Sequence, residues 1–194
     1  MATDSRHAAR KGARIDGQEE HADGRDSQSV KTTEVGDEQR GYDAGKKLSG
    51  RKRHIAVDTL GLILTVVVHA ASCQDYDGAR MVLMQLKQSF TRLKVIFADS
   101  AYGRNALPAW VKTTFGWVLQ TVLRPVGIRG FVILPKRWIV ERTFAWLARW
   151  RRYSKDYERN PKSSEAMIHI SMIAVMVRAI ARSWVICYGL GKAI

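Results

Sequence analysis

Cysteine is scarce in this sequence. Only Cys73 and Cys187 occur among 194 residues, they lie far apart, and no metal-ligand pattern surrounds either of them. Two thiols placed in this way do not form the disulfide framework of a small secreted protein, and they offer no soft-ligand metal site. We therefore expect two buried or incidental thiols in a reducing compartment.

The sequence also lacks segments that would direct it to a membrane. Residues 1–25 contain no apolar core of the signal-peptide type. No uninterrupted apolar run reaches the length that spans a bilayer. A cytoplasmic protein with no membrane partner is expected.

Acidic residues are few compared with basic ones. There are 18 of them against 32 lysines and arginines, which gives a net charge of +14. This excess indicates a polyanionic partner, with nucleic acid as the first candidate. A ribosomal or chromatin protein would show the same balance, so charge does not select a reaction. The apolar fraction of 46% and the length suit one globular domain with a core.

The first 50 residues contain few aliphatic side chains. Val30 and Val35 are rare exceptions in a stretch that is otherwise polar, charged and glycine-containing. Loop or disorder is the prediction for such a composition. Ordered structure is expected to begin near Gly50.

Strand-like and helix-like patterns alternate after Gly50. Residues 51–57 and 62–68 flank the turn-like tetrad 58–61, which predicts a β-hairpin. The second run is apolar on both faces and should be buried, whereas the first begins with three cations and should have an exposed end. The elements expected next are a helix carrying Ala79 to Phe90, a strand at 93–99, a short helix including Trp110 and Val111, a strand at 117–123, a helix from Pro135 and a helix at 166–182.

The last of these helices is apolar almost all round and is expected to be covered on most sides. The order of elements favours an α/β fold, a mixed sheet faced by helices, over a bundle or a barrel. It does not select one fold among the several of this type.

Two carboxylates occupy positions that favour a metal site. Asp99 ends the apolar run 93–99, and Glu141 lies in the tryptophan-rich helical segment after Pro135. Such carboxylates can converge on hard divalent cations, and a pair of cations can drive in-line attack on a phosphodiester. In the alternative reading, Asp99 only caps the next turn and Glu141 is a solvated surface residue. Asp26 is the partner that would complete the site.

Three blocks of sequence carry a more specific signal. They are DSQSVKTT at 26–33, GYDAGKK at 41–47 running into GRKRH at 50–54, and WIVERTFAW at 138–146. Together with VDTLGL at 57–62 and SKDYE at 154–158, they resemble bacterial insertion-sequence transposases of the DDE class, in the insertion sequence four/five-like superfamily. The likeness extends from about Asp26 to Arg182.

The resemblance implies an RNase H-like catalytic domain. In that family an acidic triad binds two magnesium or manganese ions, which activate water or a DNA 3′-hydroxyl for strand cleavage and transfer. Carried over by motif, the catalytic and metal-binding residues are Asp26, Asp99 and Glu141. Mg2+ (or Mn2+) fits because carboxylate oxygens are hard ligands. The implied partner is double-stranded DNA, both the terminal inverted repeats of the element and the target, in the prokaryotic cytoplasm beside the nucleoid.

Cations are expected to contact DNA near this site. Arg137 precedes Glu141 by the four positions typical of the family, while Leu134 stands where a tyrosine is usual and Ala148 where a later cation is usual. Arginine suits phosphate because its fork binds two oxygens. The basic residues before His54 are candidates for phosphate contacts. The alternative is that they only form a solvated surface. The complete set of predicted DNA-binding residues is Lys46, Lys47, Arg51, Lys52, Arg53, Arg137, Arg142 and Arg149.

Two departures from the family pattern predict a partial copy. In relatives an apolar strand precedes the first aspartate, but residues 20–25 read EHADGR, which is too polar for a buried central strand. The first strand is therefore expected to be missing or degraded. Residues 1–25 also lack the helical region that recognises the element's ends. The predicted division is an unrelated disordered segment at 1–25, a catalytic domain at 26–183 and a C-terminal tail at 184–194, in an N-terminally truncated or frameshifted copy with weak or no activity.

Two other functions stay open at this point. A non-catalytic DNA-binding fragment could modulate full-length transposase by occupying DNA or by mixed association, and the high positive charge supports it. An unrelated nuclease of the same fold would cleave DNA without strand transfer. A homo-oligomer is compatible with each function.

Overall fold

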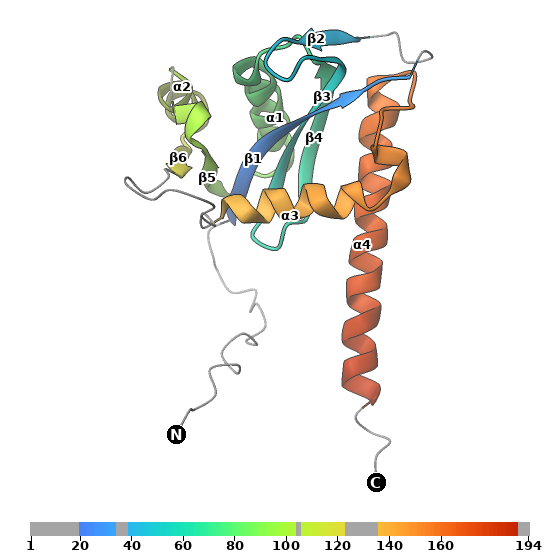
Figure 1. The fold of residues 1–194 in the computed structure, drawn as a ribbon. Helices are drawn as coiled ribbons and strands as arrows, with labels where there is room; N and C mark the ends of the chain where they lie inside the picture. Colours follow the sequence, from blue (N-terminus) through green and yellow to red (C-terminus); the bar gives the residue numbers. More distant parts are fainter. Residues whose placement is uncertain (1–19, 34–38, 104–105, 123–135, 190–194) are drawn as a thin grey trace, which may run out of the picture.

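The computed structural model describes residues 20–33, 39–103, 106–122 and 136–189, and within these ranges it describes side chains from Ser27 to Arg182. Figure 1 shows a sheet with helices on both faces and one long helix that projects from the body. The elements are β1 (Glu20–Lys31), β2 (Gly41–Asp43), β3 (Leu48–Asp58), β4 (Ile63–Ala70), α1 (Asp75–Ser89), β5 (Leu93–Asp99), α2 (Leu107–Phe115), β6 (Val118–Val122), α3 (Arg137–Ala148) and α4 (Pro161–Gly189), with short 3-10 turns η1 (Ser100–Gly103) and η2 (Arg151–Tyr153).

The sheet is mixed, as expected. Its strand order is β2-β3-β1-β5-β6, and β4 also pairs with β3. β3 runs antiparallel to β1, β2 and β4, whereas β1, β5 and β6 run parallel to one another. β1 therefore lies in the interior of the sheet, between β3 and β5.

The expectation that the first strand is missing or degraded is wrong. β1 begins at Glu20, pairs with β3 from Ala22 to Lys31, and pairs with β5 at its start. The polar composition misled the prediction because strand pairing is made by backbone groups, and hydrogen bonding on both edges outweighs a low strand propensity. The loop prediction for residues 1–50 is likewise wrong for β1 and β2. The boundary predicted after residue 25 falls inside β1, and residues 1–19 lie outside the described part of the chain.

Two apolar clusters cover the two faces of the sheet. On one face, Ala56 and Val67 pack with residues of α1 and α2 such as Leu83 and Leu107. On the other face, Ile55, Val57, Val66 and Val68 pack with residues of α3 and α4, including Val140 and Ile168. Successive side chains of a strand point to opposite faces, so the alternation within β3 and β4 assigns each residue to one layer.

Most of the predicted elements are confirmed. The hairpin is β3 and β4, β4 is buried over Thr65–His69, and the predicted helices and strands between residues 75 and 122 all occur. The helix predicted from Pro135 begins at Arg137 in the described residues. α4 is longer than predicted and continues to Gly189, past the boundary expected at residue 183. Residues 190–194 of the expected tail lie outside the described part.

The cationic start of β3 is buried, which contradicts the expected exposed end. The exposed fractions of Arg51, Lys52 and Arg53 are 0%, 6% and 1%. Arg51 and Arg53 turn toward the segment between α3 and α4, while Lys52 turns toward the start of α1. A buried charge is tolerated only where it is paired and hydrogen-bonded, so each cation requires specific partners.

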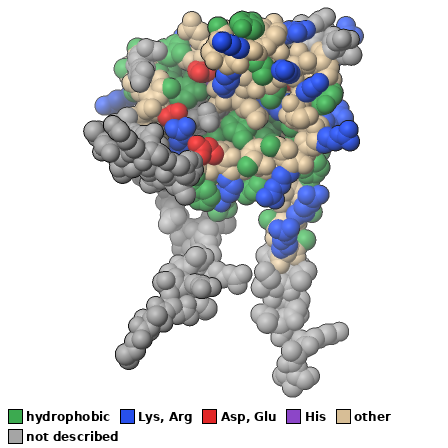
Figure 2. All heavy atoms as spheres, in the orientation of Figure 1, with side chains coloured by type: hydrophobic (Ala, Val, Ile, Leu, Met, Phe, Trp, Pro, Cys, Tyr) green, Lys and Arg blue, Asp and Glu red, His purple; other side chains and the backbone are tan. Residues whose placement is uncertain are grey.

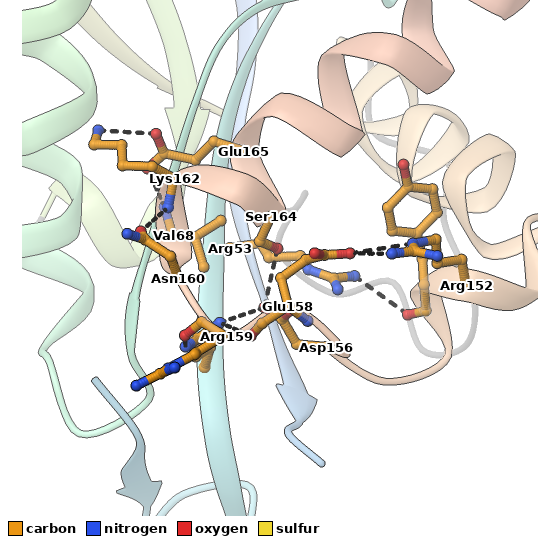
Figure 3. A network of polar contacts seen from close by, with 12 residues as sticks. Arg53, Val68, Arg152, Asp156, Glu158, Arg159, Asn160, Lys162, Ser164 and Glu165 are labelled. Atoms are coloured by element: carbon orange, nitrogen blue, oxygen red, sulfur yellow. Dashed lines mark hydrogen bonds and ion pairs between the residues drawn. The ribbon is translucent and has the colours of Figure 1, made fainter. Parts of the chain in front are cut away.

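Asp156 is the central partner on the α3–α4 side (Figure 3). Its carboxylate lies 3.5 Å from Arg51 Nη1, accepts a hydrogen bond from Ser164 Oγ at 2.9 Å and accepts another from Glu158 N. The Arg51 guanidinium also donates to the carbonyl oxygens of Glu158 and Arg159. The backbone N of Asp156 donates to Lys31 O of β1 at 2.7 Å. This network fastens the segment after η2 to both β1 and β3.

A second cluster of polar residues lies on the opposite face of β3, around Lys52 and His54. Lys52 Nζ donates to Asp75 Oδ1 at 3.0 Å and to Cys73 O at 3.0 Å. The rings of His54 and His69 stack with their centroids 4.9 Å apart. α1 can approach these rings because residue 78 is glycine: a Cβ there would lie 2.5 Å from His54 Nε2 and 2.6 Å from His69 Nε2.

Asp156→Ala is expected to lower the free energy of unfolding by about 3–5 kcal/mol, because it leaves the buried Arg51 charge without its carboxylate. Urea unfolding followed by circular dichroism measures the change. The matched control is Glu158→Ala, which removes an ion pair with the half-exposed Arg152 and should have a much smaller effect. Equal losses for the two variants would show that Arg51 does not depend on Asp156.

Stability is also expected to fall below neutral pH through His69. Burial lowers the pKa of His69 from its usual 6.5, although its hydrogen bond to Ala70 O and the nearby Asp75 and Asp77 act in the opposite direction. The unfolded chain therefore takes up the proton more readily than the folded protein. The full contribution is present above pH 6.5 and is lost as the pH falls through the lowered pKa.

Thermal unfolding from pH 7.5 to 5 measures this dependence. His69→Asn keeps an amide that can donate to Ala70 O but cannot titrate, so its melting temperature should fall less steeply with acid than that of the wild type. An unchanged slope would assign the acid sensitivity to other groups.

Candidate active site

Asp99 stands at the end of β5, where the sequence placed it. Its Oδ1 accepts hydrogen bonds from Ser100 N at 2.6 Å and Ser100 Oγ at 3.2 Å, so it does cap the following turn. Its side chain keeps 25% exposure and also contacts Arg137. Capping and ligand binding are therefore compatible for this carboxylate, which has a second oxygen and an open side.

Glu141 lies on the outer side of α3. The helix buries Ile139, Val140, Thr143 and Leu147 against the sheet, which leaves position 141 with a 47% exposed side chain. A solvated position of this kind is what a ligand-binding carboxylate needs when the other face of its helix is part of the core. α3 also contacts β1 and β5, which brings Glu141 near Asp99 at the C-terminal end of β5.

Arg137 joins the two carboxylates. Its Nη1 lies 3.4 Å from Asp99 Oδ1, and its Nε lies 3.1 Å from Glu141 Oε1. One guanidinium group thus lies between carboxylates from β5 and α3. Figure 2 shows acidic side chains on either side of a basic one on this face of the molecule. Two carboxylates that contact one cation are close enough to bind a single divalent ion together, because such ions prefer oxygen ligands.

The backbone places Asp26 beside this pair. Asp26 pairs with Ile55 of β3, and on the other edge of β1 the register sets Ala22 opposite Ile96 of β5. β1 and β5 run parallel and pair as far as Ala22 and Ile96. Asp26 and Asp99 follow these two residues by four and three positions, so they lie at nearly the same level on neighbouring strands. The side chain of Asp26 lies outside the described part of the structure.

Among the described side chains, no group of three histidines, cysteines, aspartates or glutamates forms a metal-binding cluster. The described part supplies two carboxylates of the predicted triad, Asp99 and Glu141. Their carboxylate oxygens fit a magnesium or manganese ion. Asp99 and Glu141 would hold such an ion, with Asp26 as the third ligand that the sequence predicts.

Arg142 has a structural role that the sequence did not reveal. Its Nη2 donates to Leu60 O at 2.6 Å, and its guanidinium lies between the rings of Trp138 and Trp146, at 4.4 and 4.8 Å. Thr143 Oγ1 donates to Gly61 O at 2.7 Å. Gly61 has a φ of +84°, which glycine adopts readily. These contacts fasten α3 to the turn between β3 and β4.

The remaining predicted DNA contacts fall into two groups. Arg51, Lys52 and Arg53 are buried in the networks described above, so their assignment as phosphate contacts conflicts with their exposure. Lys46 and Lys47 are exposed in the turn between β2 and β3. Arg149 is also exposed and lines a groove of about 670 Å³ with Trp146 and Trp150. Leu134, the departure noted before Glu141, lies outside the described residues.

The residues that sequence reasoning missed are the acidic partners of the buried cations. Asp156 lies in the SKDYE block, and Asp75 lies in the first turn of α1. The signal that could have found them is the run of three cations and a histidine at residues 51–54, inside a predicted strand. A strand covered on both faces would require acceptors on both sides of that run.

Comparison with protein families gives one match that bears on this site. A family model described as "Transposase DDE domain" matches residues 25–177, which include Asp26, Asp99 and Glu141. A search of curated proteins finds no match. The mixed sheet with helices on both faces is consistent with the RNase H-like fold of such domains.

Arg137→Ala is expected to raise the affinity for Mn2+ by about 10-fold, because it removes the cation that lies between Asp99 and Glu141 and leaves their mutual repulsion uncompensated. Isothermal titration calorimetry in the absence of DNA measures the affinity directly. Arg149→Ala removes an equal charge near the C-terminal end of α3 and serves as the control. If both variants bind Mn2+ like the wild type, the cation does not compete for this site.

Proposed function

The chain belongs to the transposase DDE domain family, whose function is DNA transposition, and on this premise we propose that it catalyses metal-dependent cleavage and transfer of DNA strands for an insertion sequence. DDE transposases generally use divalent metal ions. We propose that two Mg2+ or Mn2+ ions are held here by Asp26, Asp99 and Glu141. Such ions would polarise the scissile phosphate and activate water or a 3′-hydroxyl.

The observation that carries the proposal is the convergence of Asp99 and Glu141 on one guanidinium group. The two carboxylates come from different elements, and each lies within 3.4 Å of Arg137. The shared arginine compensates the repulsion between the two carboxylates, and a divalent ion at the same place would do so too. The position of β1 supports the third role, because it gives Asp26 an interior strand beside Asp99.

DNA recognition is proposed for the exposed cations. Lys46 and Lys47 lie in the turn before β3, and Arg137 lies at the carboxylates, where it would turn to a DNA phosphate once metal is bound. The family implies DNA as the partner. The terminal inverted repeats and the target duplex are the specific partners that we propose. Transposases are typically soluble cytoplasmic proteins, and association with the nucleoid is part of the proposal.

The alternative is a non-catalytic DNA-binding fragment that modulates full-length transposase. Its support was the charge of +14 together with the expected loss of the first strand, and that strand is present. The charge of +14 is compatible with both functions. The two functions differ in one measurable respect, which is whether bound DNA is cut.

Cleavage is therefore the deciding test. The purified chain is incubated with a duplex that contains its own coding sequence and flanking DNA, with Mg2+, Mn2+ or EDTA. We expect nicking that requires the metal, and Asp99→Ala should lower its rate by at least about 100-fold because several kcal/mol of transition-state stabilisation is lost.

Asp77→Ala, which removes an exposed carboxylate from α1, is the matched control and should cleave like the wild type. Salt-dependent binding of the duplex without any cleavage would favour the DNA-binding fragment. Cleavage that persists in EDTA or in Asp99→Ala would contradict the proposed triad.

A further inference from the structure

Two of the sequence blocks meet in the structure. VDTLGL forms the turn between β3 and β4, and WIVERTFAW forms most of α3. Arg142 Nη2 donates a hydrogen bond to Leu60 O at 2.6 Å, and Thr143 Oγ1 donates one to Gly61 O at 2.7 Å. Two consecutive residues of the helix thus bind two consecutive carbonyl groups of the turn.

The turn is a firm support because its own backbone is hydrogen-bonded. Asp58 Oδ1 accepts from Leu60 N at 2.9 Å and from Leu62 N at 2.8 Å. Gly61 N donates to Asp58 O at 3.0 Å, and Asp58 N donates to Leu62 O at 2.9 Å. The carbonyl groups of residues 60 and 61 therefore keep fixed directions, and side chains bound to them are held as well.

On the helix side, two indole rings hold the Arg142 guanidinium. Trp138 precedes Arg142 by four residues and Trp146 follows it by four, so the three side chains lie along one line of α3. The guanidinium lies 4.4 Å from the centre of one ring and 4.8 Å from the centre of the other. A planar cation between two rings has little freedom to turn, and the ammonium group of a lysine could not make the same contacts.

α4 leaves α3 open on one side. Composition predicted that α4 is covered on most sides, but only 28% of Pro161–Arg182 is buried, a stretch that is long and apolar enough to cross a membrane. The helix packs on β4, and its C-terminal half projects beyond the sheet (Figure 1). The groove of about 670 Å³ lies between α4 and the residues Leu60, Trp146 and Trp150. Packing does not fix α3 from this side, so the directional bonds to the turn carry more of that task.

From these contacts we infer that Arg142 is a positioning residue for Glu141, and that the β3–β4 turn is the support through which it acts. Glu141 and Arg142 are neighbours on one helix, so a contact that fixes the rotation of α3 also fixes the direction of the Glu141 carboxylate toward Asp99. A rotation of roughly 20° would move a group at the helix surface by about 2 Å, which is as long as a metal–oxygen bond. The inference rests on the proposed function, in which Glu141 is a metal ligand.

Gly61 allows the same contact to be disturbed from the turn. Its φ is +84°, and a Cβ there would lie 2.9 Å from Thr143 Oγ1 and 3.0 Å from Arg142 Nη2. Gly61→Ala would therefore strain the backbone and push α3 away from the turn. Gly61 and Arg142 belong to different elements, so an equal effect of the two substitutions on metal binding would come from the contact that they share.

The affinity for Mn2+ in the absence of DNA, measured by isothermal titration calorimetry, tests the inference. Arg142→Ala and Gly61→Ala should each weaken Mn2+ binding by at least about 10-fold, because Glu141 no longer keeps its direction. The sign separates this effect from that of charge, since removal of a nearby cation would by itself strengthen binding, as expected for Arg137→Ala. Arg142→Lys keeps the charge but loses the planar contacts, and should bind Mn2+ as weakly as Arg142→Ala.

Each substitution has a matched control in the layer of α1 and α2. Arg80→Ala also removes an arginine that lies over two rings, those of Tyr76 and Trp110. Gly116→Ala also places a side chain at a positive φ, of +73°, but its Cβ would meet nothing within 4 Å. Both controls should bind Mn2+ within about 3-fold of the wild type. Urea unfolding of every variant separates a loss of metal affinity from a loss of folded protein.

The double variant Arg142→Ala with Gly61→Ala shows whether the turn and the arginine act together. It should bind Mn2+ within about 3-fold of Arg142→Ala alone, because the shared contact is already lost. Losses that multiply, Arg142 variants that bind like the wild type, or controls that lose as much affinity would overturn the positioning role. A wild type that does not bind Mn2+, or binding that survives in Asp99→Ala, would instead contradict the proposed metal site, and the role of Arg142 with it.

Discussion

The fold depends on the burial of four consecutive polar residues in β3. Arg51 and Arg53 point to one face of the sheet, and Lys52 and His54 point to the other. Hydrophobic burial alone cannot accommodate them, because desolvated charges require partners. The segment around Asp156 and the start of α1 at Asp75 supply those partners. The same contacts therefore attach a layer to each face of the central hairpin.

This constraint also sets the geometry of the candidate active site. β1 pairs with β3 along most of its length and with β5 at its start. Asp26 and Asp99 therefore lie on neighbouring strands. α3 is fastened to the hairpin turn by Arg142 and Thr143, which determines where Glu141 lies. The carboxylates come from three elements, which are β1, β5 and α3.

The sequence predicted the helices and strands that are marked by a local or periodic pattern of apolar residues. The hairpin, α1, β5 and α3 follow from apolar spacing, and the positions of Asp99 and Glu141 follow from β5 and α3. β1 could not be predicted from its side chains, because its stability comes from backbone pairing with β3 and β5. The burial of Arg51 depends on Glu158, 107 residues away, and no local pattern encodes such a contact. The sequence did not predict the exposure of α4. Composition shows that a helix is apolar, but it does not show whether other elements pack against it.

The contact of Asp156 with β3 also bears on how the chain folds while it is being synthesised on the ribosome. All of the sheet strands are synthesised before residue 156, yet Arg51 has no carboxylate to meet until that residue emerges. A nascent chain that ends at α3 contains every strand but leaves charged groups of the central hairpin uncompensated. The charged groups of the central hairpin thus gain all of their partners only after the C-terminal part has been translated.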